Sequence, residues 1–315
     1  MFETRDMMTG IDLGTRAVKL VRAQGGKGSR RLLQAGIADL TVEDDWASAA
    51  STALDRLLRD FRLAPRDLGV VIVAVSGKSV HLRQVEMPAL SEQELRSSLR
   101  YEARQHLPLE NIGEAALDCQ VLVPPAQDSK TQTIVMVGAP DELVKSRVKV
   151  LKSVGIEPEI VDAAPLALVN ALEGSDPEAL PLGRTVAILE IGSASSTLVL
   201  LRRGGVVYSR HVPVAAGAPV SAILASVRET VNFYSQLNER RNVDRVYLAG
   251  GGALADGLIT ELGRQIGVPV ELLDATRRLT YAPTKGLGIP VDQLSAVAPR
   301  LSVALGMLYW GDGRV

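Results

Sequence analysis

The pattern of hydrophobic and polar positions repeats once along the chain. An apolar run with a short polar turn at 11–21 can be laid without a gap over a second such run at 189–199. Each copy leads into a Gly-rich turn, at 24–30 and 202–206, of the kind that connects two strands of a hairpin. Self-similarity of this kind indicates a duplicated structural unit.

Each half continues with a further strand, a helix and a buried strand. Apolar residues recur at helical spacing in the helix, and the strands are short apolar runs. These elements are predicted at 31–40, 46–61 and 70–75 in the first half and at 206–214, 220–234 and 245–252 in the second. The order β-β-β-α-β, found twice, predicts two related α/β domains that face each other.

Residues from about 85 to 154 have no counterpart in the second half. Ser91 and Glu94 have the S-x-x-E spacing of a capping box, which predicts that a helix begins there. Two strands and a second helix follow, and together they predict a small α+β subdomain. We therefore divide the chain into a first domain at 1–84 and 155–180, the inserted subdomain at 85–154 and a second domain at 181–315, with a turn-rich boundary at 173–184.

The composition of the chain argues against several classes of protein. The chain of 315 residues has 35 basic and 36 acidic side chains, so no bulk attraction to nucleic acid is expected. Its one cysteine, Cys119, lies in a strand pattern, and its three histidines are far apart, which leaves no basis for a disulfide framework or a His-ligated metal. No signal segment and no membrane span is apparent, so we expect a cytoplasmic protein.

The two repeated turns carry the same chemistry. Asp12 aligns with Glu190, Gly14 with Gly192, and Thr15 with Ser193. A tight turn with glycine and hydroxyl residues can direct backbone N–H groups at an anion. Two such turns on facing domains would bind a polyphosphate from both sides.

Three further groups complete a nucleotide site. The Asp12 carboxylate suits Mg²⁺ that is bound through water. The Lys19 side chain leaves its strand at a point from which its ammonium could reach the phosphates. The glycines at 250–252, between a strand and a helix that begins near Leu254, would let a flat ring or ribose approach the backbone. The predicted site is Asp12, Gly14, Thr15, Arg16, Lys19, Glu190, Gly192, Ser193, Ser196, Gly250, Gly251 and Gly252.

Each of these motifs also has a purely structural explanation. The Gly-rich hairpins can simply turn strands, and Asp12 can accept backbone hydrogen bonds. Lys19 can be solvated, and the three glycines can provide room to turn. The duplication favours the phosphate site over these alternatives.

The motifs resemble those of the actin-like ATPases, a superfamily that includes actin, the Hsp70 chaperones, sugar kinases and the division protein FtsA. "GIDLGTRAVKLV" is similar to the first phosphate loop, "LEIGSASSTLVL" to the second and "LAGGGALADGL" to the adenosine motif. Within it, "VRETVNFYSQLNERRNVDRVYLAGGGALADGL" resembles the PilM family of type IV pilus assembly proteins most closely. The resemblance covers nearly the whole chain and implies a duplicated actin-like, ribonuclease H-like α/β fold with an FtsA/PilM-type insertion.

The resemblance also implies ligands and partners. It implies ATP with Mg²⁺ as cofactors, and a groove between the insertion and the first domain that receives the N-terminal cytoplasmic tail of a PilN-like inner-membrane protein. Pilus motor ATPases and self-association are further interactions that it allows. Arg96, Arg100 and Arg104 form an i, i+4 stripe that would face the partner or, alternatively, solvent. The terminal "GMLYWGDGRV" is too short and glycine-rich for a membrane-binding helix, so we expect indirect attachment.

Two departures from the superfamily pattern bear on activity. Glu190 replaces the usual Asp of the second loop, and a misplacement of about 1 Å can cost on the order of 100-fold in rate. The chain also enters the helix near Val220 directly, where relatives have a longer outer subdomain. The resemblance implies that Asp162 is the best-placed acid for catalysis, yet it could equally cap the helix that follows.

These features favour an assembly scaffold that binds ATP and hydrolyses it slowly or not at all. Two other functions stay open: a nucleotide-free adaptor similar to type II secretion components, and a small-metabolite kinase of the same superfamily. The kinase is the least favoured, because no substrate pocket is apparent.

Overall fold

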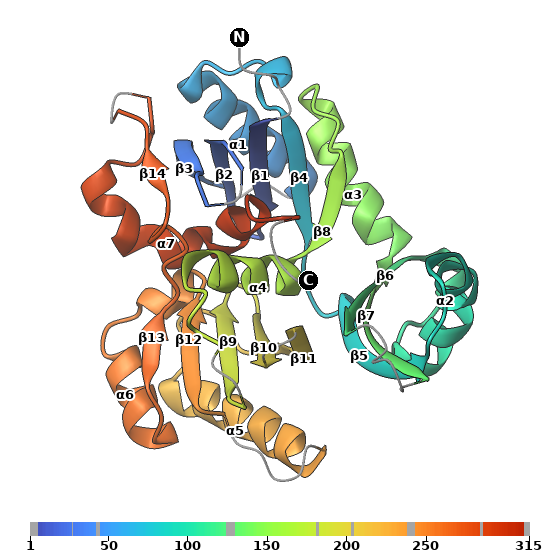
Figure 1. The fold of residues 1–315 in the computed structure, drawn as a ribbon. Helices are drawn as coiled ribbons and strands as arrows, with labels where there is room; N and C mark the ends of the chain where they lie inside the picture. Colours follow the sequence, from blue (N-terminus) through green and yellow to red (C-terminus); the bar gives the residue numbers. More distant parts are fainter. Residues whose placement is uncertain are drawn as a thin grey trace.

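The computed structural model describes residues 6–26, 28–41, 45–123, 130–180, 183–202, 205–237, 243–283 and 286–311. Parts of the predicted Gly-rich turns, the loop at 124–129, residues 181–182 of the boundary and the terminal 312–315 lie outside the described residues. The chain forms two mixed β-sheets with two helices between them (Figure 1). This arrangement confirms the predicted pair of related α/β units.

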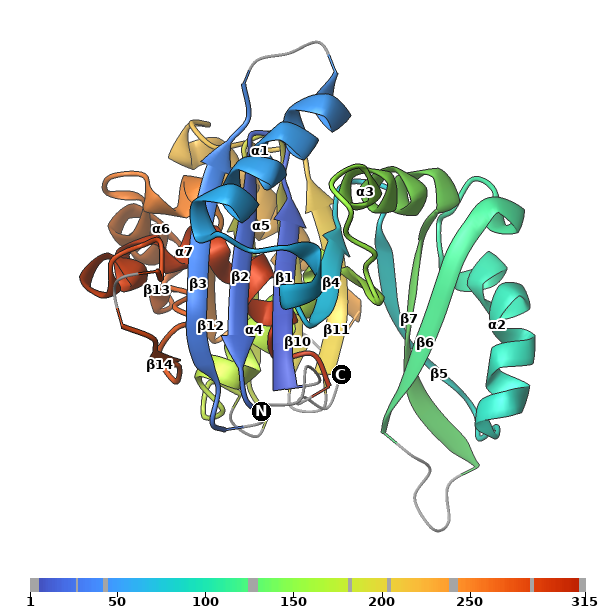
Figure 2. The same ribbon diagram turned by 90° about the horizontal axis from the view of Figure 1, so that it is seen from above.

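The first sheet has the strand order β14-β3-β2-β1-β4-β8. Its outer face is covered by α1 (Trp46–Phe61), whose N-terminus is capped by Asp45 (Figure 2). The predicted order β-β-β-α-β is present here, with a short 3-10 helix (Pro65–Asp67) before β4. The strands are β1 (Met7–Leu13), β2 (Ala17–Gln24), β3 (Arg31–Asp39), β4 (Val70–Val75), β8 (Ile160–Ala163) and β14 (Thr280–Tyr281).

The second sheet has the order β13-β12-β9-β10-β11-β5-β7-β6. The duplicated unit is formed by β9 (Thr185–Ile191), β10 (Ser196–Arg202), β11 (Gly205–Val212), α5 (Val220–Leu237) and β12 (Arg245–Ala249). The chain then forms a short 3-10 helix (Gly251–Leu254), α6 (Leu258–Ile266) and β13 (Val270–Leu272). The helix near Leu254 therefore begins four residues later than predicted, because Gly257 adopts a left-handed conformation at its N-terminus.

The insertion adds three strands to this second sheet. They are β5 (His81–Pro88), β6 (Ala115–Val123) and β7 (Thr131–Pro140), so the first of them begins four residues before the boundary expected at residue 85. In the described strands, one residue pair, Tyr208 with Arg83, joins them to β11. The α2 helix (Glu92–His106) covers the far side of these strands, and Ser91 and Glu94 form the predicted capping box (Figure 2). A short 3-10 helix (Ile112–Glu114) precedes β6, and α3 (Asp141–Ser153) returns the chain to the first sheet.

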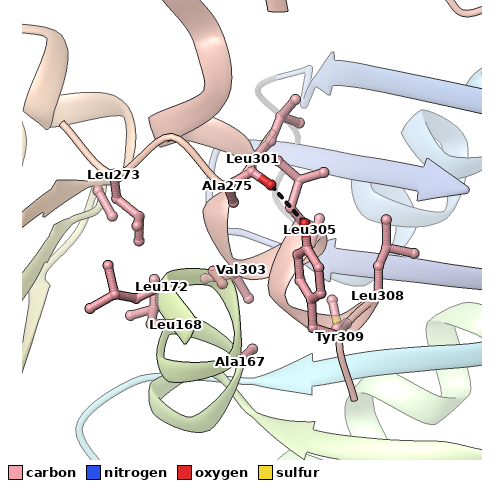
Figure 3. Close-up of a cluster of buried hydrophobic side chains, with 14 of the residues drawn as sticks. Ala167, Leu168, Leu172, Leu273, Ala275, Leu301, Val303, Leu305, Leu308 and Tyr309 are labelled. Atoms are coloured by element: carbon pink, nitrogen blue, oxygen red, sulfur yellow. Dashed lines mark hydrogen bonds between the residues drawn. The ribbon is translucent and has the colours of Figure 1, made fainter. Parts of the chain in front are cut away.

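Two helices form the centre of the molecule. The helices α4 (Ala164–Ser175) and α7 (Val291–Met307) pack against each other between the sheets, within the largest buried apolar cluster (Figure 3). Near the end of α7, the Tyr309 hydroxyl donates to the Ala275 carbonyl at 3.2 Å. No helix in the described part of the chain is long and apolar enough to cross a membrane.

Candidate functional site

The two repeated turns have the same local geometry. In the β1–β2 hairpin the Gly14 N–H donates to the Ala17 carbonyl at 3.1 Å, and in the β9–β10 hairpin the Gly192 N–H donates to the Ser195 carbonyl at 3.0 Å. A Cβ atom on either glycine would approach that same carbonyl oxygen, to 2.8 Å and 2.7 Å. Both turns therefore depend on glycine at this position.

The turns meet across the two halves. The Thr15 and Ser193 hydroxyl oxygens lie 2.7 Å apart, in a hydrogen bond that either can donate. Among the described hydrogen bonds, none uses the backbone N–H groups of Thr15, Arg16, Ser193 or Ala194. Exposed turns with several such open N–H groups, which no described hydrogen bond uses, are suited to bind an anion. The residues present therefore fit a phosphate group.

The charged residues of the turns lie beside this point. Asp12 and Lys19 are opposite each other in the β1–β2 register, and the Lys19 ammonium is 2.8 Å from the Asp12 carboxylate. Burial raises the pKa of Glu190 to about 7, and the Asp12 carboxylate adds to the rise while Lys19 opposes it. The positive charge of Lys19 therefore offsets the negative charges of Asp12 and Glu190. This side chain is not simply solvated, as the purely structural explanation of the motif would have it. Within the described ranges, no group of three His, Cys, Asp or Glu is arranged to hold a metal.

The three glycines differ in their surroundings. A Cβ on Gly250 would lie 2.4 Å from the Ile191 carbonyl oxygen and 2.7 Å from a carboxylate oxygen of Glu190. A Cβ on Gly252 would lie 2.4 Å from the Ile191 side chain, whereas one on Gly251 would meet nothing within 4 Å. Gly250 and Gly252 therefore allow close packing on β9, and Gly251 alone is open to a nucleoside.

Two predicted residues lie away from the open turns. Ser196 is buried, and its hydroxyl donates to the Val214 carbonyl. Asp162 is buried at the end of β8, where one carboxylate oxygen accepts from the Ala163 N–H and the other has no described partner. The N-cap of α4 is Ala163, with no side-chain cap hydrogen bond, so Asp162 does not cap this helix. Burial raises the pKa of Asp162 to about 7.

An arginine that the sequence analysis did not single out lies beside the first turn. The guanidinium carbon of Arg147, on α3, is 4.0 Å from the centre of the Trp46 ring. The Trp46 indole N–H donates to the Gly14 carbonyl at 3.0 Å. One signal was available, because Arg147 has the helical spacing that places it on the same face as the apolar Val144, Val148 and Leu151.

The arginine stripe of α2 is partly used within the insertion. Arg96 pairs with Glu92 at 3.0 Å, and Arg100 donates to the Ile112 carbonyl at 2.7 Å. Arg104 is exposed. Between α2, β6 and the start of α3 lies an open hollow of about 420 Å³, lined by Arg96, Leu99, Arg100, Ala115, Ala116, Leu117 and Asp141.

Comparison with known proteins agrees with this architecture. A structure described as a PilM–PilN type IV pilus biogenesis complex matches with a TM-score of 0.80 and 22% identity, over 95% of this chain and 97% of that chain. The ethanolamine utilization protein EutJ from Carboxydothermus hydrogenoformans matches with a TM-score of 0.52 and 14% identity, over 97% of this chain and 90% of that chain. At these identities the two structures show the fold.

A family model matches nearly the whole chain and identifies its family. The model described as type IV pilus assembly protein PilM matches residues 10–216 and 218–309, and thus includes both turns, the insertion and the central helices. The predicted α/β actin-like fold is confirmed by these matches. The chain belongs to the PilM family of type IV pilus assembly proteins.

Proposed function

We propose that this chain is a nucleotide-binding scaffold of type IV pilus assembly. It binds ATP with Mg²⁺ where its two halves meet, and it binds the N-terminal cytoplasmic tail of a PilN-like membrane protein, which holds it at the cytoplasmic face of the inner membrane. The observation that supports the nucleotide site is the direct meeting of two turns with open N–H groups, joined by the Thr15–Ser193 hydrogen bond. Membership of the PilM family supports the assembly role.

Different residues of the site would contact different parts of the proposed ligand. The open N–H groups of both turns would hold phosphate oxygens, and Asp12 would hold Mg²⁺ through water. Gly251 would contact the nucleoside. The metal would neutralise phosphate charge, and Lys19, already within 2.8 Å of Asp12, would add to this neutralisation.

The proposed scaffold hydrolyses ATP slowly or not at all. The register of β1, β4 and β8 places Asp12 and Asp162 at the same level on strands that are two positions apart, a separation of roughly 10 Å. Asp162 is buried among apolar groups, and the pKa of Glu190 is raised to about 7. Neither acid is therefore held as a fully ionised base next to the open turns at neutral pH.

Nucleotide binding is tested by thermal stability with and without ATP·Mg²⁺. A ligand at 100 times its dissociation constant should stabilise the wild type by roughly 2.7 kcal/mol. Ser193→Ala should reduce this increment, because its hydroxyl lies at the meeting point of the turns. The matched variant Ser196→Ala should lower stability by about 1–2 kcal/mol, since it removes the donor to the buried Val214 carbonyl, but should keep the ligand increment.

Two outcomes would replace this proposal. No stabilisation of the wild type in millimolar ATP would favour the nucleotide-free adaptor. Rapid phosphoryl transfer to a small metabolite in a coupled assay, with no binding of the membrane-protein tail, would favour the kinase.

Partner binding is tested with a peptide of the PilN-like tail. The proposed contact surface on the insertion includes the hollow beside Arg96 and Arg100. In calorimetry, Arg96→Glu should weaken peptide binding by about tenfold or more, because it reverses an exposed charge at this hollow. Arg59→Glu is the matched control, since Arg59 is an exposed arginine on α1 with the same i, i+4 type of ion pair, to Asp55. Equal affinities for both variants would show that the α2 stripe is only a solvated face.

A further inference from the structure

Arg147 connects α3 to the first turn through the Trp46 ring. Its guanidinium lies against the Trp46 ring, and Trp46 in turn donates to the carbonyl of Gly14. The Nε atom of Arg147 is buried and has no hydrogen-bond partner. None of the described hydrogen bonds or ion pairs uses any of the five N–H donors of this side chain, although a guanidinium in a folded protein normally uses several of them.

The electrostatic surroundings place this cation at the site. Burial lowers the pKa of Arg147, and the Asp12 carboxylate acts in the opposite direction, which shows that the two charges are close enough to interact. Asp12 already has Lys19 at 2.8 Å. A guanidinium that is partly desolvated and unpaired next to an already neutralised acid is costly to keep unless it has another anionic partner.

Stacking on Trp46 prepares Arg147 for such a partner. A planar guanidinium held on an aromatic ring has few rotamers left to lose when it binds, and its donor edge suits phosphate oxygens. Purely structural packing would leave the buried Nε donor without a partner. We therefore propose that Arg147 is a phosphate-binding residue, contributed by α3, for a polyphosphate held by the two turns.

This position has a consequence for the insertion. At its first turn, α3 packs through Leu143 and Val144 into a cluster with Val75, Ala139 and Ala163, which come from β4, β7 and β8. The helix therefore contacts both the first sheet and the insertion's strands. A phosphate contact at Arg147 would order α3, the last helix of the insertion, and so link occupancy of the turns to the insertion's strands.

The inference rests on the proposed nucleotide binding, and the experiment separates the two. Calorimetry would measure ATP·Mg²⁺ and inorganic tripolyphosphate with Mg²⁺ against the wild type, Arg147→Met and Arg147→Lys. Lys149→Met is the matched control, because Lys149 is exposed on the same helix. We expect Arg147→Met to weaken both ligands at least tenfold, Arg147→Lys to weaken them less, and Lys149→Met to change neither by more than about twofold.

A structural readout accompanies the affinities. Hydrogen exchange of α3 amides should slow when ATP·Mg²⁺ binds to the wild type, but not when it binds to Arg147→Met. If the wild type binds neither ligand, nucleotide binding fails and the inference falls with it. If the wild type binds and Arg147→Met behaves like Lys149→Met, the role of Arg147 alone is overturned. Should Arg147→Met not fold, equal affinities of Arg147→Lys and wild type would overturn it.

Discussion

Gly306→Ala is expected to lower the free energy of unfolding by about 3 kcal/mol or more, whereas Gly263→Ala should raise it by up to about 1 kcal/mol. The two substitutions are chemically identical and both lie in helices. A Cβ on Gly306 would lie 1.8 Å from the carbonyl oxygen of Ala167 and 2.6 Å from its carbonyl carbon. A Cβ on Gly263 would meet nothing closer than 3.7 Å, so alanine there gains helix propensity at no packing cost.

The large effect at Gly306 follows from the rigidity of its neighbour. The atom that a methyl group would meet belongs to the backbone of α4, and a buried helix cannot yield as a flexible side chain does. Urea unfolding, followed by circular dichroism, measures both variants against the wild type. Equal midpoints for the two variants would show that α4 and α7 can separate without loss of stability.

The difference in stability between the wild type and Asp162→Asn is expected to change by on the order of 3 kcal/mol between pH 4 and pH 8. In the folded protein the pKa of Asp162 is raised from its ordinary 3.8 to about 7, because the carboxyl is buried. Below pH 3.8 both states are protonated and the stabilising contribution is complete. As pH rises toward 7, the unfolded chain releases this proton while the folded chain keeps it, so the contribution is lost.

The measurement is the urea midpoint of both proteins at a series of pH values. Taking the difference removes the titration of all other groups, Glu190 included. Asp55→Asn is the control, because this carboxyl is exposed and pairs with Arg59 at the surface, so its replacement should change stability by less than about 1 kcal/mol. A constant difference for Asp162→Asn would mean that the carboxyl is solvated in the folded protein.

Local patterns in the sequence predicted most of the elements. The α1 helix was predicted at its observed residues, 46–61, because its apolar residues recur at helical spacing; the capping role of Asp45 is seen only in the structure. The capping box at Ser91 and the two hairpins at Gly14 and Gly192 were also local signals. Duplication then predicted that the two turns lie on facing domains, and the structure places the Thr15 and Ser193 hydroxyl oxygens 2.7 Å apart.

Contacts between distant segments were not predictable in the same way. The two-residue strand β14 pairs with β3 although some 240 residues separate them, and no periodicity marks so short a strand. The buried position of Ser196 depends on the loop after β11, whose Val214 carbonyl accepts its hydroxyl. Arg147 was overlooked because its neighbours Lys145 and Lys149 suggested a solvated face, although its spacing places it on the inner one.

The single residue pair between β5 and β11 determines how the insertion is attached. The insertion is covalently continuous with the first sheet, but among the described residues its hydrogen-bonded strands continue those of the second through the pair of Tyr208 with Arg83. The Arg83 guanidinium also lies 5.2 Å from the centre of the Tyr208 ring and donates to the Ser209 carbonyl at 3.3 Å. If the two halves rotate relative to each other, the insertion must either turn with the second half or lose this junction, so its orientation depends on the angle between the halves.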